Sequence, residues 1–274
     1  MKFAALPRFV LLAALAGACA FTGCGSLKNA QSSVPPSLAP SDGNWSFVTT
    51  STFVSGQVSH IGGNLTVSEN NVSSTMHTDL LGFDSSLPFT FSGTLQNNQI
   101  TFTSPANANS QVITLIATVA STSTISGTYT VSAGGGNAAD QGTVTAALVP
   151  SLSGPWNGQI NGDYYGDQHA VLSMTLTQAP TASSDGTFAL TGNLTFANYG
   201  CFTSGTVSNS SVAGSMVIIN GTALEPDGVT QGSFTYNNVL LNNPASPTSM
   251  NGTYDVTDGG DCSSDTDTPT FTKQ

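Results

Sequence analysis

The sequence predicts an all-β protein made of two tandem, related antiparallel units, each a β-barrel or β-sandwich of about eight strands. Apolar and polar residues alternate with a period of two, as in Leu-Ser-Met-Thr-Leu-Thr over 172–177, and this period is typical of strands that bury one face. No window shows an apolar stripe at helical spacing. Gly, Asn, Asp and Pro interrupt the alternation about every 8–12 residues, which is the spacing of sandwiches and barrels.

A duplication is the third observation behind this fold class. Gly43-Asn-Trp45 recurs as Gly154-Pro-Trp156, an offset of 111 residues (156 − 45), and Gly127-Thr-Tyr129 recurs as Gly252-Thr-Tyr254, an offset of 125 (254 − 129). The difference of 14 residues indicates an insertion in the second copy. The register that aligns Gly63 with Gly192 would need the offset to rise and then fall, so we prefer the first alignment.

The chain begins with the pattern of a secretion signal. Lys2 and Arg8 precede the apolar run Phe9–Ala20, and Phe-Thr-Gly-Cys follows at 21–24. About a dozen apolar residues are too few to cross a ~30 Å hydrocarbon layer as a helix. This segment resembles the signal peptides of bacterial lipoproteins, and the resemblance implies that Cys24 is acylated.

An alternative interpretation of the signal is ordinary cleavage after Ala18 or Ala20, which would give a secreted protein. Phe21 stands where lipoprotein signals usually carry Leu, and Cys19 is a second candidate site. Small Gly23 before the cysteine favours Cys24. With lipidation, we expect the protein to be anchored in the cell envelope and to lie at the outer membrane, since the residue after Cys24 is not Asp.

In chain order, we expect five segments. They are a lipoprotein signal peptide (1–23), the lipidated cysteine with a Ser- and Pro-rich flexible tether (24–40), the first β-unit (41–148), a linker (149–155) and the second β-unit (156–274).

The charge of the chain excludes several functions. Lys and Arg number four, namely Lys2, Arg8, Lys28 and Lys273, against 15 acidic residues. Removal of residues 1–23 gives a formal charge of 2 − 15 = −13. Nucleic-acid binding needs cationic side chains that displace counterions, so no nucleic-acid partner is expected. No lysine of the folded part suits Schiff-base chemistry, and no cofactor is expected.

Two cysteines, Cys201 and Cys262, lie beyond the signal and anchor. An even pair in an oxidising compartment predicts a disulfide. The loop it closes has roughly 60 residues, for which the chain-entropy model gives about 4 kcal/mol. A metal-thiolate site is the weaker alternative because no CxxC pattern or nearby His accompanies the pair.

The Gly-x-Trp that opens each unit and the Gly-Thr-Tyr near its close resemble the pattern of calycin barrels such as lipocalins and avidins. This resemblance implies that first and last strands pair and that Trp45 and Trp156 plug one end. The whole arrangement resembles tandem β-repeat lipoproteins of soil bacteria such as acidobacteria. That second resemblance implies no chemistry.

Possible catalytic or metal sites are few. His77-Thr-Asp79 and Asp167-Gln-His169 each place His and Asp two residues apart, on one strand face. A hydrolase using His77 or His169 is therefore one alternative, although such pairs are common on surfaces.

The acidic run near the C-terminus suggests a second kind of site. Asp258, Asp261 and Asp265 are calcium candidates, but their spacing does not match an EF-hand and a solvated turn explains them better.

Exposed aromatic residues could bind glycans, and Tyr164-Tyr165 is the candidate pair. The preferred register aligns it with Phe53-Val54, from which we expect at least one of the tyrosines to be core. Trp45 and Trp156 are likewise expected in the core.

The leading functional hypothesis is a non-enzymatic, lipid-anchored envelope protein that acts as a scaffold or binding module, with the membrane as its partner through the lipid. The alternative is binding of an apolar small molecule or a glycan by a calycin-like barrel. An enclosed apolar ligand needs a cavity of a few hundred Å³.

Overall fold

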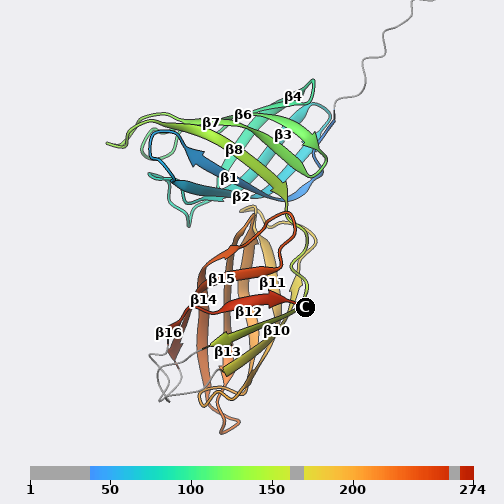
Figure 1. The fold of residues 1–274 in the computed structure, drawn as a ribbon, viewed down its shortest axis with the longest axis vertical. Helices are drawn as coiled ribbons and strands as arrows, with labels where there is room; N and C mark the ends of the chain where they lie inside the picture. Colours follow the sequence, from blue (N-terminus) through green and yellow to red (C-terminus); the bar gives the residue numbers. More distant parts are fainter. Residues whose placement is uncertain (1–37, 161–169, 259–265) are drawn as a thin grey trace, which may run out of the picture. The chain divides into compact units, whose positions relative to one another are not determined.

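The computed structural model describes residues 38–160, 170–258 and 266–274. These residues form seventeen strands and no helix. Figure 1 shows that each half of the chain forms a β-sheet body of its own, and the strand pairing is antiparallel in both. In the described part of the chain, no helix is long and apolar enough to cross a membrane.

The first body is a closed eight-stranded barrel, in which each strand pairs with its neighbour in sequence and β1 pairs with β8. Its strands are β1 (Gly43–Ser51), β2 (Val58–Ser68), β3 (Asn71–Thr78), β4 (Phe89–Gln96), β5 (Gln99–Thr103), β6 (Ile113–Ser121), β7 (Thr124–Val131) and β8 (Asp140–Leu148).

The second body closes in the same way through eight strands in the order β9-β10-β11-β12-β13-β14-β15-β17, with β17 returning to β9 and a short β16 added to β15. Its strands are β9 (Gly154–Ile160), β10 (Ala170–Gln178), β11 (Phe188–Ala197), β12 (Ser204–Ala213), β13 (Met216–Leu224), β14 (Gln231–Leu241), β15 (Ser249–Asp258), β16 (Thr266–Asp267) and β17 (Thr270–Lys273). The predicted two-unit all-β fold is confirmed. Of the two predicted alternatives for each unit, the structure shows the barrel and not the sandwich.

The two copies share one register. Trp45 of β1 lies opposite Gly63, and Trp156 of β9 lies opposite Met174, which is the predicted offset of 111. At the closing strands, Trp45 faces Leu148 and Trp156 faces Lys273, the predicted offset of 125. The rival alignment is wrong, because Gly63 belongs to β2 whereas its proposed equivalent Gly192 belongs to β11, one strand further along.

The extra residues of the second copy are spread over more than one connection. The turn 69–70 between β2 and β3 has a nine-residue equivalent, 179–187, between β10 and β11. The turn 122–123 between β6 and β7 has a seven-residue equivalent, 242–248, between β14 and β15. Most of the 14-residue difference therefore enters at two hairpins, where length can change without breaking strand pairing.

Each tryptophan seals its barrel near the start of the first strand. Trp45 is fully buried and its indole N–H donates to the carbonyl oxygen of Ser41 at 2.8 Å, while Trp156 donates in the same way to Leu152 at 2.8 Å. Each acceptor lies four residues before its tryptophan. The predicted core role of both tryptophans is confirmed.

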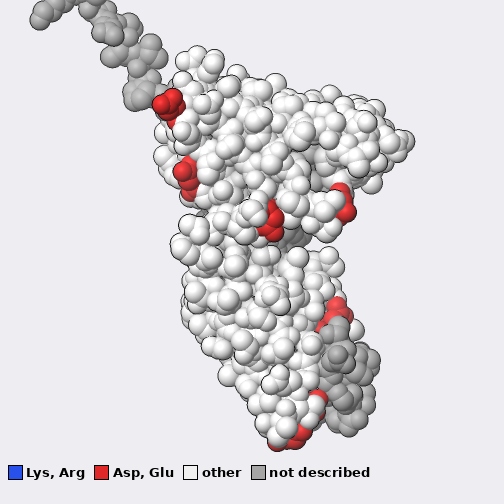
Figure 2. Space-filling model, turned by 180° about the vertical axis from the view of Figure 1, so that it is seen from behind, with Lys and Arg blue, Asp and Glu red and all other residues white. Residues whose placement is uncertain are grey.

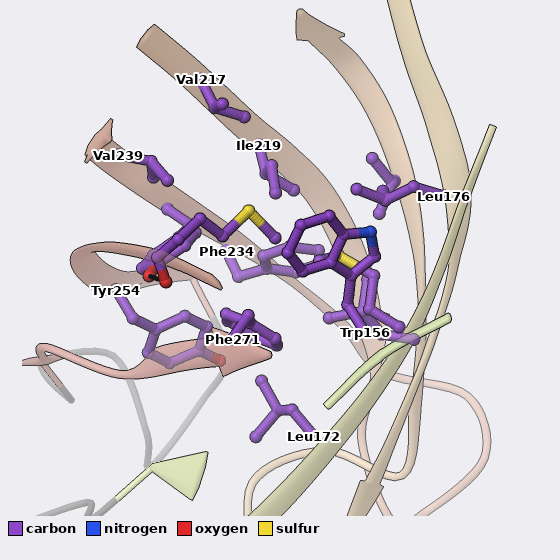
Figure 3. Packing of buried hydrophobic residues seen from close by; sticks show 14 of the residues in the cluster. Trp156, Leu172, Leu176, Val217, Ile219, Phe234, Val239, Tyr254 and Phe271 are labelled. Carbon is purple, nitrogen blue, oxygen red and sulfur yellow. Dashed lines mark hydrogen bonds between the residues drawn. The ribbon is translucent and has the colours of Figure 1, made fainter. Parts of the chain in front are cut away.

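The interior of each barrel is filled by side chains. In the second barrel, Trp156, Ile219, Phe234 and Phe271 converge from different strands (Figure 3). A cavity of about 10 Å³ remains beside Ile219, Phe234 and Phe271, which is about the room of one water molecule. This space holds no apolar ligand of the size that a carrier would enclose.

The two ends of the first barrel differ. At one end, which we call the tight-turn end, two-residue connections at 69–70, 97–98 and 122–123 join the strands. Asn97 and Asn98 both have positive φ, 51° and 63°, as the hairpin turn that matches strand twist requires. At the other end, which we call the long-loop end, four longer loops join the strands, namely 52–57, 79–88, 104–112 and 132–139.

The repeat allows a stability prediction at Lys273. Its Nζ lies 5.5 Å from the centre of the Trp156 ring and donates to the Ser151 carbonyl oxygen at 2.9 Å. The first barrel has Leu148 at the equivalent place. We expect Lys273→Ala to lower the free energy of unfolding by about 1–2 kcal/mol, because Trp156 loses its cover and its cation–π partner and the Ser151 carbonyl loses a hydrogen bond from Lys273. We expect Lys273→Leu to retain most of that stability in urea denaturation, since the Leu side chain covers the ring. Equal losses in the two variants would contradict the covering role.

Candidate functional site

Apolar side chains are exposed at the long-loop end of the first barrel. In the described residues of this barrel, large apolar side chains with high exposure number six, and five of them lie at this end. They are Phe53 (63% exposed), Val54 (55%), Val58 (48%), Leu81 (70%) and Leu87 (60%). The sixth, Ile116, lies on β6. Burial of such a side chain is worth about 1.5–3 kcal/mol, so this grouping favours a binding surface.

The five side chains come from neighbouring parts of the barrel. Phe53 and Val54 lie in the loop 52–57, and Val58 begins β2. Leu81 and Leu87 lie in the loop 79–88, which follows β3, and β3 pairs with β2. We call these five residues the apolar loop cluster. Figure 2 shows one face of the molecule, on which acidic side chains are isolated spots in a largely uncharged surface.

A hydrogen-bond network holds the loop that carries Phe53 and Val54. The Ser51 hydroxyl accepts from the backbone N–H groups of Phe53 and Val54, both at 3.1 Å, and donates to Asp140 Oδ1 at 2.6 Å. The buried Tyr129 hydroxyl donates to Asp140 Oδ2 at 2.6 Å. The carboxylate of Asp140 thus connects the barrel interior to the base of the loop.

Tyr129 is a structural donor in this network. Burial, followed by the hydrogen bond to Asp140, raises the pKa of Tyr129 to about 12. The phenol therefore stays protonated at physiological pH and continues to donate. Such a group fixes a loop and does not exchange a proton with a substrate near neutral pH.

Amide side chains hold the three other long loops. Asn107 and Asn109 each donate from Nδ2 to the carbonyl oxygen of Gly82, at 3.0 and 2.8 Å. Asn107 Oδ1 accepts from the backbone N–H groups of Asn109 and Gln111, both at 2.9 Å. Asn137 donates to Gln111 Oε1 at 3.4 Å. These bonds join loops 79–88, 104–112 and 132–139, so the surface is ordered before any partner arrives.

The predicted pair of His77 with Asp79 is wrong. Asp79 lies one residue beyond the end of β3, where strand alternation no longer fixes its side chain. Its carboxylate instead accepts from the backbone N–H of His60 at 2.5 Å and contacts His60 Nδ1 at 2.9 Å. The His60–Asp79 pair joins the start of β2 to the loop 79–88, beside the apolar loop cluster.

His77 has other neighbours. Its Nδ1 lies 3.1 Å from the Ser85 carbonyl oxygen and its Nε2 lies 3.2 Å from the Asp185 carbonyl oxygen. Both ring nitrogens thus face backbone acceptors. A general base needs a free ring nitrogen directed at a substrate or nucleophile, so this arrangement does not support a hydrolase role for His77.

Several predicted site residues lie outside the described residues, and those predictions stay as they are. They are Cys24, Tyr164, Tyr165, Asp167, His169, Asp261, Cys262 and Asp265.

Two further predicted residues are described at least in part. Cys201 is buried in the core of the second barrel, and its predicted bond to Cys262 stays a prediction. Asp258 ends β15. Within the described ranges, no group of three or more His, Cys, Asp or Glu residues could hold a metal ion.

The alignment with Phe53-Val54 does not support a core position for Tyr164-Tyr165, because Phe53 and Val54 are both more than half exposed. A loop at the end of a barrel can present apolar side chains to solvent. The exposure of Leu81 and Leu87 was also missed, since single leucines in a Gly-, Ser- and Pro-rich segment give no periodic signal.

The network at Asp140 gives a pH prediction. The pKa of Tyr129 is about 12 in the folded chain and about 10 in an unfolded chain. The stability from its protonated form is therefore fully present below pH 10 and is lost as the pH rises toward 12. We expect Tyr129→Phe to lower the free energy of unfolding by about 1 kcal/mol at neutral pH. Between about pH 10 and pH 12, the free energy of unfolding should fall less steeply in this variant than in the wild type. Chemical denaturation across the interval checks this, and an unchanged slope would contradict it.

No family model and no curated protein matches the chain. A solved structure of a protein of unknown function from the DUF3598 family of Nostoc punctiforme is similar at 14% sequence identity with a TM-score of 0.23, over 85% of this chain and 96% of that one.

Proposed function

We propose that this protein is a lipid-anchored component of a bacterial cell envelope, without enzymatic activity, that binds a partner through the long-loop end of its first barrel. The observation that carries the binding role is the apolar loop cluster, whose side chains are exposed on loops held by internal hydrogen bonds. Loops ordered in advance lose little entropy on binding, as an interaction surface requires.

The proposed anchor is compatible with this surface. Residues 38–42 lead into β1, and β1 begins at the tight-turn end of the first barrel. The segment between Cys24 and the barrel is Ser- and Pro-rich, a composition typical of a spacer.

The filled barrels favour this proposal over a carrier. The second barrel has room for about one water molecule among its apolar side chains. The interior of the first barrel is lined by residues that are almost completely buried, among them Trp45, Phe47 and Phe102. Binding at the loops needs no cavity.

The anchor is tested by metabolic labelling with palmitate in a bacterial host. We expect label on the wild-type chain and none on Cys24→Ser, because the thiol is the acylated atom. Cys19→Ser is the matched control and should still be labelled. Absence of label from the wild type, or persistent label on Cys24→Ser, would sink the anchor proposal.

The binding surface is tested by photo-crosslinking in intact cells of the source bacterium. Benzoylphenylalanine at position 53 places the photoreactive group in the apolar loop cluster, and the same residue at position 229 is the control, since Val229 is 81% exposed in the second barrel. We expect a discrete crosslinked species from position 53 only. Equal patterns from the two positions would contradict a specific surface at the long-loop end.

A further inference from the structure

We propose that the partner of the apolar loop cluster is a cationic amphipathic polypeptide segment, with apolar side chains at its centre and Lys or Arg around them. This inference rests on the proposed binding function and adds the chemistry of the partner. Its basis is the combination of an apolar centre, a carboxylate rim and the lack of any Lys or Arg among the described residues of the first barrel.

The apolar centre is formed by side chains suited to anchoring. Phe53 and Leu81 are the most exposed of the cluster, at 63% and 70%. Their loops flank the start of β2 and the end of β3, which pair with each other. The His60–Asp79 contact joins the same two segments at 2.9 Å. The two anchors therefore lie on neighbouring loops at the same end of the barrel, which is where a single partner would have to reach both.

Carboxylates border this centre. Asp79 has 42% of its side chain exposed beside His60. Asp84 is exposed in the same loop as Leu81 and Leu87, and its carboxylate accepts from the Ser86 hydroxyl at 2.6 Å and from the Ser86 backbone N–H at 2.9 Å. These bonds lower the pKa of Asp84 below its usual value. Both bonds favour the ionised form of Asp84, so its carboxylate stays negative across physiological pH.

Among the described residues no Lys or Arg lies at this rim, where His60 is the neighbour of Asp79 at 2.9 Å. Across residues 38–160, 170–258 and 266–274, Lys273 is the one Lys or Arg, and it lies on Trp156 of the second barrel. The whole chain has a formal charge of −11. An uncompensated negative field attracts cationic partners and speeds their association, and complementary rim charges add specificity.

The same charges disfavour other occupants. A second copy of the chain, docked through the same end, would bring Asp79 and Asp84 toward equal charges. An anionic lipid surface would be repelled by both carboxylates. A zwitterionic lipid surface would satisfy the apolar side chains but would leave the carboxylates without partners, which favours the cationic polypeptide.

The test measures binding of the full-length chain to a synthetic Leu/Lys amphipathic helical peptide by fluorescence anisotropy. We expect saturable binding that weakens with added salt. Phe53→Ser combined with Leu81→Ser should weaken it at least about tenfold, through loss of both anchors. Asp84→Asn should weaken it less and reduce its salt dependence. Val229→Ser combined with Asp227→Asn, on an exposed loop of the second barrel, is the matched control and should leave binding unchanged.

Three further probes separate the outcomes. A Leu/Glu peptide of the same pattern should bind at least tenfold more weakly than the Leu/Lys peptide, and equal affinity would overturn the inference about charge. Tighter association with phosphatidylcholine vesicles than with the Leu/Lys peptide, or dimerisation of the chain in sedimentation, would overturn the cationic segment as the partner. If Phe53→Ser combined with Leu81→Ser abolished that association or dimerisation, the proposed surface itself would still be supported. If no probe responds to that double variant and position 53 also gives no specific crosslink, the proposed function itself fails. Thermal unfolding checks that every variant is folded.

Discussion

Closure of each barrel by pairing of its first and last strands is the constraint on which the rest of the structure depends. β1 pairs with β8 and β9 pairs with β17, so that neither barrel is left with an unpaired edge between these strands. The tryptophan of each first strand lies at this seam, buried against the interior and hydrogen-bonded four residues back. With charged residues at 7% of the chain, ion pairs contribute little, and backbone pairing around a filled interior holds each barrel together.

The alternation of apolar and polar residues was enough to predict the strands. Leu172, Met174 and Leu176 are buried, and the hydroxyl residues between them are exposed. The offset of 111 also predicted which residues face each other across the first two strands of each copy. The sequence pattern did not distinguish a barrel from a sandwich, because closure of a barrel depends on hydrogen bonds between strands about a hundred residues apart. Strand patterning contains no information on those bonds.

The site was harder to predict because it lies in loops. Phe53 and Leu81 are exposed although they are large and apolar. Their exposure depends on the conformation of the loops that carry them. The Ser51–Asp140–Tyr129 network joins β1 to the consecutive strands β7 and β8, and Ser51 lies 89 residues before Asp140. One signal did exist for it, since the Gly-Thr-Tyr segment and a following Asp recur in both copies. The pairing of His77 with Asp79 was predicted wrongly, because it extended strand alternation one residue beyond the end of β3.

The same closure explains why a binding surface can evolve at the long-loop end. Because strand pairing and the buried core already fix the barrel, residues in the long loops are free of any role in closure. Their order comes instead from local bonds, namely the Asp140 carboxylate at one loop and the amides of Asn107 and Asn109 at the others. These bonds use polar groups and leave apolar side chains unpaired at the surface. Stability therefore comes from the tryptophan-sealed core, and the recognition that we propose rests on separate residues, namely the apolar loop cluster and its neighbours Asp79 and Asp84.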